Sequence, residues 1–247
     1  MKLLIAIDDT DSLESRGTGH LAQIMIEKIE QSQWGTCSGI TRHQLFVHED
    51  IPYTSHNSAM CFEAEIDKYH YEDLIHFGMR FLETESEKGS DPGLCVVNME
   101  NGLNTDMLTA FGRRAKTEVV EKLAAYAIAN DLGIHLSEHG GNGQGIVGAL
   151  AGTGLRLTGN DGRFRGWLYY GKAGERISVK ELLADGIVDM VQSNEGQIIS
   201  PESSVLLSEE KIKAVLRDHR QVVLVRNTTP ACSIKWQTLT KKQVKQI

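Results

Sequence analysis

The chain has 247 residues, of which 40% are hydrophobic and 24% are charged, as is typical of one or two globular domains. This composition excludes a disordered or collagen-like protein. The formal net charge of −7 excludes phosphate binding driven by overall charge, so nucleic-acid binding would need a local basic patch. No apolar run approaches the roughly 20 residues that cross a bilayer, and we expect a cytoplasmic protein with no membrane partner.

Strands and helices are predicted to alternate through the first two thirds of the chain. The apolar run Leu3 to Ile7 predicts a strand buried on both faces, and the next apolar residues have helical spacing. Strands are expected at 3–7, 35–47, 58–66 and 94–98, a loop at 52–57, and helices at 21–33, 71–82, 105–111, 119–128 and 146–151. This alternation predicts the α+β or α/β class.

The last third of the chain is predicted to contain shorter elements. Ser178 and Glu181 have the spacing of a capping box, which predicts that a helix begins there. Strands are expected at 167–170 and 222–225, and a helix is expected after Ser208. Residues 184–201 are the least periodic and are expected to cross between domains.

Three carboxylates, Asp8, Asp9 and Asp11, follow directly after the first predicted strand. Like charges this close repel one another, so some must hold a proton or bind a cation. Mg²⁺ takes one or two carboxylates and completes its shell with water and substrate phosphates. We therefore predict a magnesium site at these aspartates, with Thr10 and Ser12 as further ligand contacts. The alternative is that the aspartates only cap the following helix and form an Asx turn.

Two glycine-containing segments are candidates for phosphate binding. In the first, Gly17 and Gly19 flank Thr18 at the start of a predicted helix, where Thr18 could bind or accept a phosphate. The alternative is that Thr18 is an ordinary N-cap. In the second, Gly143 and Gly145 belong to a glycine-rich loop that lacks the Lys-Ser/Thr of a P-loop. The alternative for this loop is a tight turn with close helix packing.

Five motifs occur in an order that resembles the archaeal isoleucine-tRNA agmatinylcytidine synthetases. They are the acidic string at 7–12, the glycine–threonine turn at 17–19, Ile-Pro-Tyr-Thr at 51–54, the glycine-rich segment at 143–150, and Asn-Thr-Thr-Pro at 227–230. The string Ile-Asp-Asp-Thr-Asp-Ser is the most specific of the five. The resemblance spans nearly the whole chain, although the motifs cover only about 25 residues.

The resemblance implies a split kinase-like domain, formed by residues 1–57 and 196–247, around a ferredoxin-like domain at 58–195. It implies that ATP phosphorylates the 2-carbonyl oxygen of a cytosine and that agmatine then displaces the phosphate. Asp8, Asp9 and Asp11 would hold magnesium and ATP phosphates, and Thr18 would be autophosphorylated. The chain has no CxxC pair for the zinc ribbon of the archaeal enzymes, which also have an OB-fold that holds the tRNA.

The sequence therefore predicts an ATP- and magnesium-dependent ligase or phosphotransferase that activates the carbonyl of a nucleobase or small molecule. Its net charge argues against tRNA as the substrate but leaves it possible. Two alternatives stay open. One is a haloacid-dehalogenase-type phosphatase with Asp9 as the nucleophile; the other is a non-catalytic nucleotide-binding module.

Overall fold

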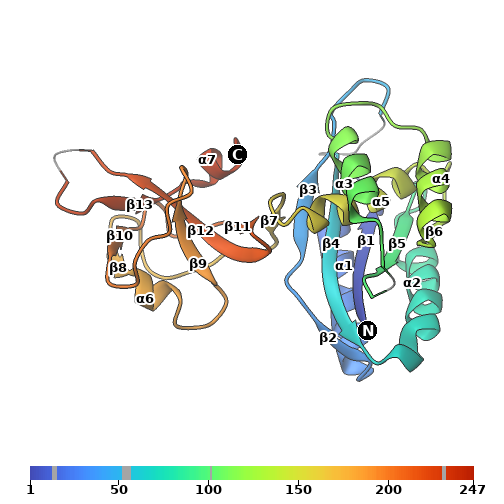
Figure 1. Ribbon diagram of the computed structural model, residues 1–247, viewed down its shortest axis with the longest axis horizontal. Helices are drawn as coiled ribbons and strands as arrows, with labels where there is room; N and C mark the ends of the chain where they lie inside the picture. The colour runs from blue at the N-terminus through green and yellow to red at the C-terminus, as the bar shows by residue number, and fades with distance from the viewer. Residues whose placement is uncertain (13–15, 52–56, 101, 230–231) are drawn as a thin grey trace. The chain divides into compact units, whose positions relative to one another are not determined.

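The computed structural model describes residues 1–247 except 13–15, 52–56, 101 and 230–231, and it divides into two compact units. Unit 1 is residues 1–158 and unit 2 is residues 159–247 (Figure 1). No helix in the described part of the chain is long and apolar enough to cross a membrane.

Unit 1 contains an antiparallel sheet in the order β6-β5-β1-β4, with β2 and β3 both paired to β4. Its strands are β1 (Lys2–Asp8), β2 (Gly35–Cys37), β3 (Thr41–Gln44), β4 (Ser58–Ile66), β5 (Gly93–Asn98) and β6 (His135–Glu138). Its helices are α1 (Thr18–Gln31), the 3₁₀ turn η1 (Lys68–His70), α2 (Tyr71–Glu85), α3 (Thr105–Arg114), α4 (Lys122–Leu132) and α5 (Gly145–Leu157).

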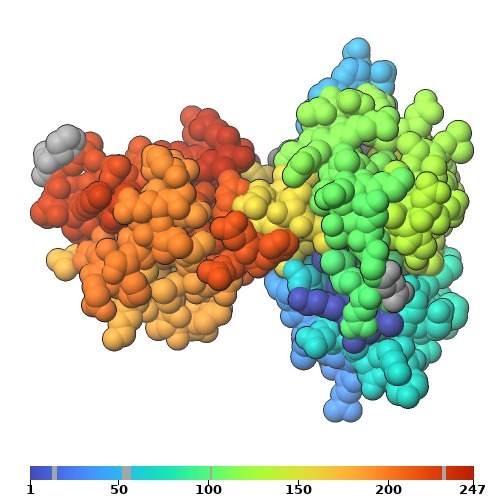
Figure 2. Space-filling model, in the orientation of Figure 1, coloured from blue at the N-terminus to red at the C-terminus, as the bar shows by residue number. Residues whose placement is uncertain are grey.

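Strand β1 is buried on both faces because helices cover both faces of this sheet. Leu3, Ile5 and Ile7 pack with residues of α1 and α2, whereas the alternate residues Leu4 and Ala6 pack with α3, α4 and α5. Successive side chains of a strand point to opposite faces, so Asp8 is directed to the side of Leu4 and Ala6. Only a narrow band of the dark-blue N-terminal segment reaches the surface in Figure 2.

Unit 2 contains a mixed sheet with its own core. The strand order is β7-β11-β12-β13-β10-β8, and β9 pairs in parallel with β12. The elements are β7 (Arg163–Phe164), β8 (Arg176–Ser178), α6 (Val179–Leu182), β9 (Met190–Ser193), β10 (Ser204–Leu206), β11 (Ala214–Arg217), β12 (Arg220–Asn227), β13 (Trp236–Thr238) and α7 (Lys241–Val244).

Most of the predicted elements are confirmed, and the errors concern short strands. The predicted capping box forms, since Ser178 and Glu181 exchange the expected hydrogen bonds at the start of α6. The predicted strand at 35–47 is two strands, β2 and β3, and strand β6 was not expected. The predicted strand at 167–170 is a single bridge between Leu168 and Ile212. The loop expected at 52–57 lies mostly outside the described residues.

The helix predicted after Ser208 is wrong, because these residues form strand β11. Asp218 and His219 both have positive φ, which is the conformation of a two-residue hairpin turn. This turn joins β11 to β12 and pairs Val215 with Val222 in antiparallel register. An Asp-His pair is not a usual sequence signal for such a turn. The apolar residues before it therefore predict a helix when only the local pattern is considered.

The compact units do not follow the predicted domain limits. Strand β1 pairs with both β4 and β5, so residues 1–57 pack with residues that were assigned to an insertion at 58–195. The boundary lies after Thr158 rather than within 184–201. The structure confirms the mixed α and β class, and the kinase-like and ferredoxin-like assignments stay predictions.

Candidate functional site

The candidate site begins at Asp8, the last residue of β1. Its carboxylate is only 8% exposed, and its Oδ1 accepts a hydrogen bond from the backbone N–H of Asp9 at 2.9 Å. The other oxygen faces α5, where a Cβ on Gly148 would lie 1.6 Å from Oδ2. Burial, together with the neighbouring charge of Asp9, raises the pKa of Asp8 to about 8. Asp8 therefore holds a proton at neutral pH.

Asp9 is the second carboxylate of the site, and the carboxylates of Asp91 and Asp11 lie close enough to act on it. Burial, and then the charges of Asp91 and Asp11, raise the pKa of Asp9 to about 6. Its backbone has a φ of 50°, a left-handed conformation that Asp adopts more readily than most residues. Asp91 lies in the turn before β5, 82 positions from Asp9 in the sequence. An acidic cluster of Asp8, Asp9, Asp11 and Asp91 is thus formed from two distant segments; we call it the acidic cluster below.

The glycine-rich loop holds Asp91. Oδ1 of Asp91 accepts hydrogen bonds from the backbone N–H groups of Asn142 and Gly143, the second at 3.2 Å. The backbone oxygen of Asp91 also accepts from the N–H of Gly145 at 3.0 Å. The loop therefore binds a protein carboxylate through the backbone N–H groups of Asn142 and Gly143. The role of Gly143 and Gly145 at a phosphate stays a prediction.

The other side of the loop is fixed by α4 and β6. Glu138 accepts hydrogen bonds from Lys122 and from the hydroxyl of Tyr126, each at 2.8 Å, and Lys122 also donates to the backbone oxygen of Asn142. These hydrogen bonds lower the pKa of Glu138. Gly143 has a φ of 75°, and a Cβ there would lie 1.5 Å from the Glu138 carboxylate, so only glycine fits.

Close packing also explains the glycines at the start of α5. A Cβ on Gly145 would lie 2.2 Å from the backbone oxygen of Asp91 and 3.0 Å from that of Asp8. The end of β1, the turn before β5 and the start of α5 therefore meet at one point. The interpretation of this segment as a tight turn with close helix packing is consistent with these contacts.

Asp11 connects the acidic cluster to the start of α1. Its Oδ2 accepts a hydrogen bond from the backbone N–H of Thr18 at 3.2 Å. The N-cap of α1 is Gly17, so the interpretation of Thr18 as an ordinary N-cap is wrong. Thr18 is instead the first helical residue and is only 5% exposed. Gly19 lies in the same turn, and Ser12 is exposed.

The residues of the acidic cluster fit a divalent cation in their chemistry. Their donors are carboxylate oxygens, which Mg²⁺ prefers, and the buried Oγ1 of Thr10 has no hydrogen-bond partner among the residues that the structure describes. Across the described residues, no three His, Cys, Asp or Glu side chains are already arranged around a metal position. A magnesium ion at this cluster would take one or two of the carboxylates and complete its shell with substrate phosphates and water.

The contact between Asp8 and Gly148 predicts a non-additive effect on stability. Gly148→Ala should lower the free energy of unfolding by about 1–3 kcal/mol, because its Cβ would overlap the Asp8 carboxyl group in a packed site. In an Asp8→Ala background the same substitution should cost much less, since the obstructing oxygen is gone. Denaturant unfolding of the four proteins measures this coupling. Equal costs in both backgrounds would contradict the placement of Asp8.

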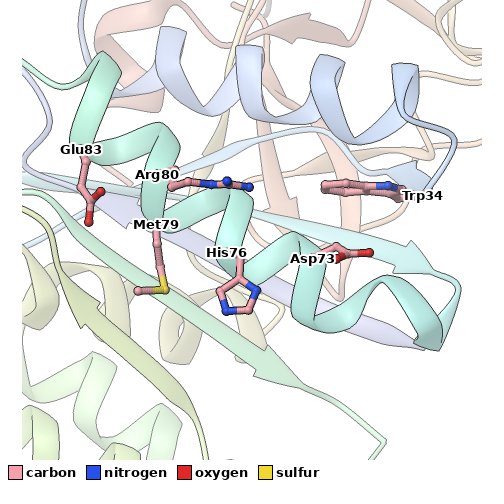
Figure 3. Close-up of a pocket in the computed structure, with 6 residues that line it drawn as sticks. All are labelled: Trp34, Asp73, His76, Met79, Arg80 and Glu83. Carbon is pink, nitrogen blue, oxygen red and sulfur yellow. The ribbon is translucent and has the colours of Figure 1, made fainter.

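A pocket in unit 1 has none of the predicted site residues in its lining. It is lined by Trp34 and by five residues of α2, which are Asp73, His76, Met79, Arg80 and Glu83 (Figure 3). The ring of Trp34 stacks on His70 with centroids 5.9 Å apart. This pocket contains no residue of the acidic cluster or of the glycine-rich loop.

Sequence reasoning missed Asp91 and Glu138, which hold the glycine-rich loop. Asp91 had one local signal, because Asp-Pro-Gly marks a turn before a buried strand. Its distance from the aspartates at 8–11 hid the contact. Glu138 had no signal, because it ends a strand that the pattern did not predict.

No family model matches the chain. The isoleucine-tRNA 2-agmatinylcytidine synthetase TiaS of Methanosarcina acetivorans is 28% identical to it over 159 residues, which are 63% of this chain and 36% of that protein. The TiaS of Archaeoglobus fulgidus is also 28% identical, over 160 residues, 64% of this chain and 36% of its own. These matches confirm the resemblance. The chain is similar to TiaS, and the match spans about a third of the length of these proteins.

A solved structure of TiaS shares the fold. The complex of TiaS with an isoleucine tRNA and ATP has a TM-score of 0.55 and 22% sequence identity, and the match covers 81% of this chain and 49% of that chain. A second complex, with the tRNA, AMPCPP and agmatine, has a TM-score of 0.53 and 21% identity, over 88% of this chain and 52% of the other. Neither the phosphatase alternative nor the non-catalytic module finds support in these comparisons.

Proposed function

We propose that the chain is an ATP-dependent enzyme of RNA modification that resembles TiaS, and that the acidic cluster binds the phosphates of ATP through magnesium. The observation that carries the proposal is the convergence of Asp9 and Asp91 from distant segments at the end of β1. Four carboxylates in one partly buried place repel one another and raise the pKa of Asp8 and of Asp9, and this arrangement is costly unless a cation or a proton neutralises it.

The similarity to TiaS supports the choice of ATP and RNA. The solved complexes of TiaS contain an isoleucine tRNA together with ATP, or with the analogue AMPCPP and agmatine. By this likeness, the substrate is a nucleobase in an RNA, whose carbonyl oxygen is activated by phosphorylation, and an amine is the second substrate. Activation of a small-molecule carbonyl is the weaker variant of the proposal, because both complexes combine the nucleotide with a tRNA.

The environment of each side chain in the acidic cluster determines the role that we propose for it. Asp9 is mostly ionised at pH 7 and, with Asp91, would hold the ion. Asp8 keeps its proton in the free protein and would lose it to solvent when the positive charge arrives. Asp91 is oriented by the glycine-rich loop, so the loop acts on the ion through that carboxylate. Bound magnesium would neutralise charge on the phosphates during transfer.

The proposal is tested by a turnover assay with defined components. The chain is incubated with magnesium, [γ-³²P]ATP, agmatine and an unpaired cytosine-containing RNA, and ATP consumption is followed with and without the RNA. We expect consumption that depends on RNA and on magnesium and that Asp9→Asn abolishes. RNA-independent release of phosphate from simple phosphoesters would instead support a phosphatase and contradict the proposal.

We propose that Thr18 takes up or orients the transferred phosphoryl group. Its N–H is bound by Asp11, whose charge also acts on Asp9, so Thr18 lies at the edge of the acidic cluster. Thr18→Ala should change the free energy of unfolding by less than about 1 kcal/mol, because the hydroxyl does not cap α1. The same variant should lose ATP turnover by at least about 100-fold.

Transfer of the radioactive phosphate from ATP to the protein distinguishes this role of Thr18 from a structural role. Incubation with [γ-³²P]ATP should mark the parent chain and Thr18→Ser but not Thr18→Ala. Full ATP turnover by Thr18→Ala, together with an unlabelled parent, would contradict the role of Thr18 and leave the acidic cluster unaffected.

A further inference from the structure

The charge of the chain is divided unevenly between its two units. Unit 2 has 14 Lys and Arg against 10 Asp and Glu, a net charge of +4, whereas unit 1 has 12 against 23, a net charge of −11. The overall charge of −7 therefore conceals a basic unit. Phosphate contacts depend on local positive charge, so unit 2 is the part of the chain suited to bind a polyanion.

One place in unit 2 combines positive charge with an aromatic ring. The ammonium of Lys213 lies 4.5 Å from the ring centroid of Trp167, and that of Lys241 lies 5.1 Å from the same centroid. Lys213 comes just before β11 and Lys241 begins α7, both of which are labelled in Figure 1. Separate segments therefore converge on the ring of Trp167. Lys213 also donates to the backbone oxygen of Gly166 at 2.6 Å, which fixes its position beside Trp167.

A second aromatic side chain, that of Tyr169, is inferred to lie on the same face. Leu168 pairs with Ile212 through an antiparallel bridge and packs against the core of unit 2. In such an extended segment the neighbours of Leu168, Trp167 and Tyr169, point to the opposite face, with a spacing of about 6.6 Å. Tyr169 is 57% exposed. Two aromatic rings at this spacing match consecutive unpaired bases of an extended nucleic acid.

We propose that Trp167, Tyr169, Lys213 and Lys241 form a binding surface for single-stranded RNA. The lysines contact the phosphates, and unpaired bases stack on the rings. An exposed cation–π contact is weaker than base stacking, so an ammonium can leave the ring for a phosphate when a base arrives. The surface lies wholly in unit 2. The inference rests on the proposed function only in its choice of RNA over DNA.

The test is binding of a fluorescein-labelled single-stranded RNA to the full chain without ATP, measured by anisotropy at several salt concentrations. We expect Trp167→Ala to weaken binding by about 5- to 150-fold, which is 1–3 kcal/mol at 1.4 kcal/mol per tenfold. Trp167→Phe should recover most of this loss. The double variant Lys213→Gln/Lys241→Gln should reduce the slope of log K against log salt by about 1.4, or 0.7 for each lost phosphate contact.

A matched pair in unit 1 serves as the control. Tyr69 is 78% exposed, and the ammonium of Lys68 lies 5.4 Å from its ring centroid. This pair has the same chemistry in an acidic unit, so Lys68→Gln/Tyr69→Ala should leave RNA binding and its salt slope unchanged. Circular dichroism and thermal unfolding confirm that each variant is folded.

Three results would overturn the proposal. The first is unchanged RNA affinity in both the Trp167→Ala and the lysine variants. The second is equal binding of a duplex RNA with the same dependence on Trp167, because paired bases cannot stack on a side chain. The third is tighter binding of a poly-glutamate peptide than of RNA, which would indicate an acidic protein partner. Loss of ATP turnover with RNA binding intact would contradict only the function proposed for unit 1.

Discussion

Asp8→Asn should make the chain more stable at neutral pH. The pKa of Asp8 is raised from 3.8 to about 8 in the folded chain, so between these values the folded state holds a proton that the unfolded state has released. Stability therefore falls as pH rises through this interval. At pH 7 the loss is of the order of 4 kcal/mol, because one pKa unit corresponds to 1.36 kcal/mol. Asn has no such proton and still accepts the hydrogen bond from the N–H of Asp9.

Urea unfolding at pH 5 and pH 8 measures this effect. Asp8→Asn should exceed the parent by about 5 kcal/mol at pH 8 and by only about 1–2 kcal/mol at pH 5. Asp131→Asn is the control, because Asp131 is exposed on α4 and its replacement should change little at either pH. If the parent were the more stable protein at pH 8, the burial of an uncompensated Asp8 would be contradicted.

The effect of removing one charge from the acidic cluster on ATP binding should depend on magnesium. With magnesium, Asp9→Asn should weaken ATP binding by about 100-fold or more, because an ion contact to the phosphates is lost. Without magnesium the carboxylates only repel the phosphates, so the same variant should bind ATP at least as tightly as the parent. Calorimetry with and without EDTA measures both affinities.

Asp91→Asn separates the charge of this residue from its structural role. The amide oxygen of Asn can still accept the N–H groups of Asn142 and Gly143, so the glycine-rich loop should stay in place. Its ATP affinity should nevertheless change as in Asp9→Asn. Asp131→Asn again provides the control. Equal losses of affinity with and without magnesium would show that the variants disturb the fold and not an ion contact.

The sequence predicts correctly the helices and strands whose pattern depends only on residues close together in the chain. The apolar run of β1, the helical spacing in α1 and α2, and the capping box of α6 each depend on residues near one another in the chain. The hairpin of β11 and β12 was missed because its turn residues, Asp218 and His219, adopt positive φ without glycine. Strand β6 was missed because its residues are only partly buried and polar residues alternate with one leucine.

The candidate site was predicted in part for the same physical reason. Asp8, Asp9 and Asp11 are adjacent, and their crowding is visible in the sequence. The contribution of Asp91 depends on the pairing of β1 with β5, which brings Asp8 opposite Gly93. Pairing between distant strands leaves no local pattern. The glycine-rich loop was recognised as a close-approach segment, and in this structure it approaches the Asp91 carboxylate.

The most direct test of the account is a crystal structure of the chain with Mn²⁺ and a non-hydrolysable ATP analogue. Mn²⁺ takes the oxygen ligands of Mg²⁺ and can be located by its anomalous signal. We expect the ion at about 2.1 Å from a carboxylate oxygen of Asp9 or Asp91, with the phosphates of the analogue on its other side. A nucleotide bound in the pocket beside Trp34, with no ion at the acidic cluster, would contradict the account.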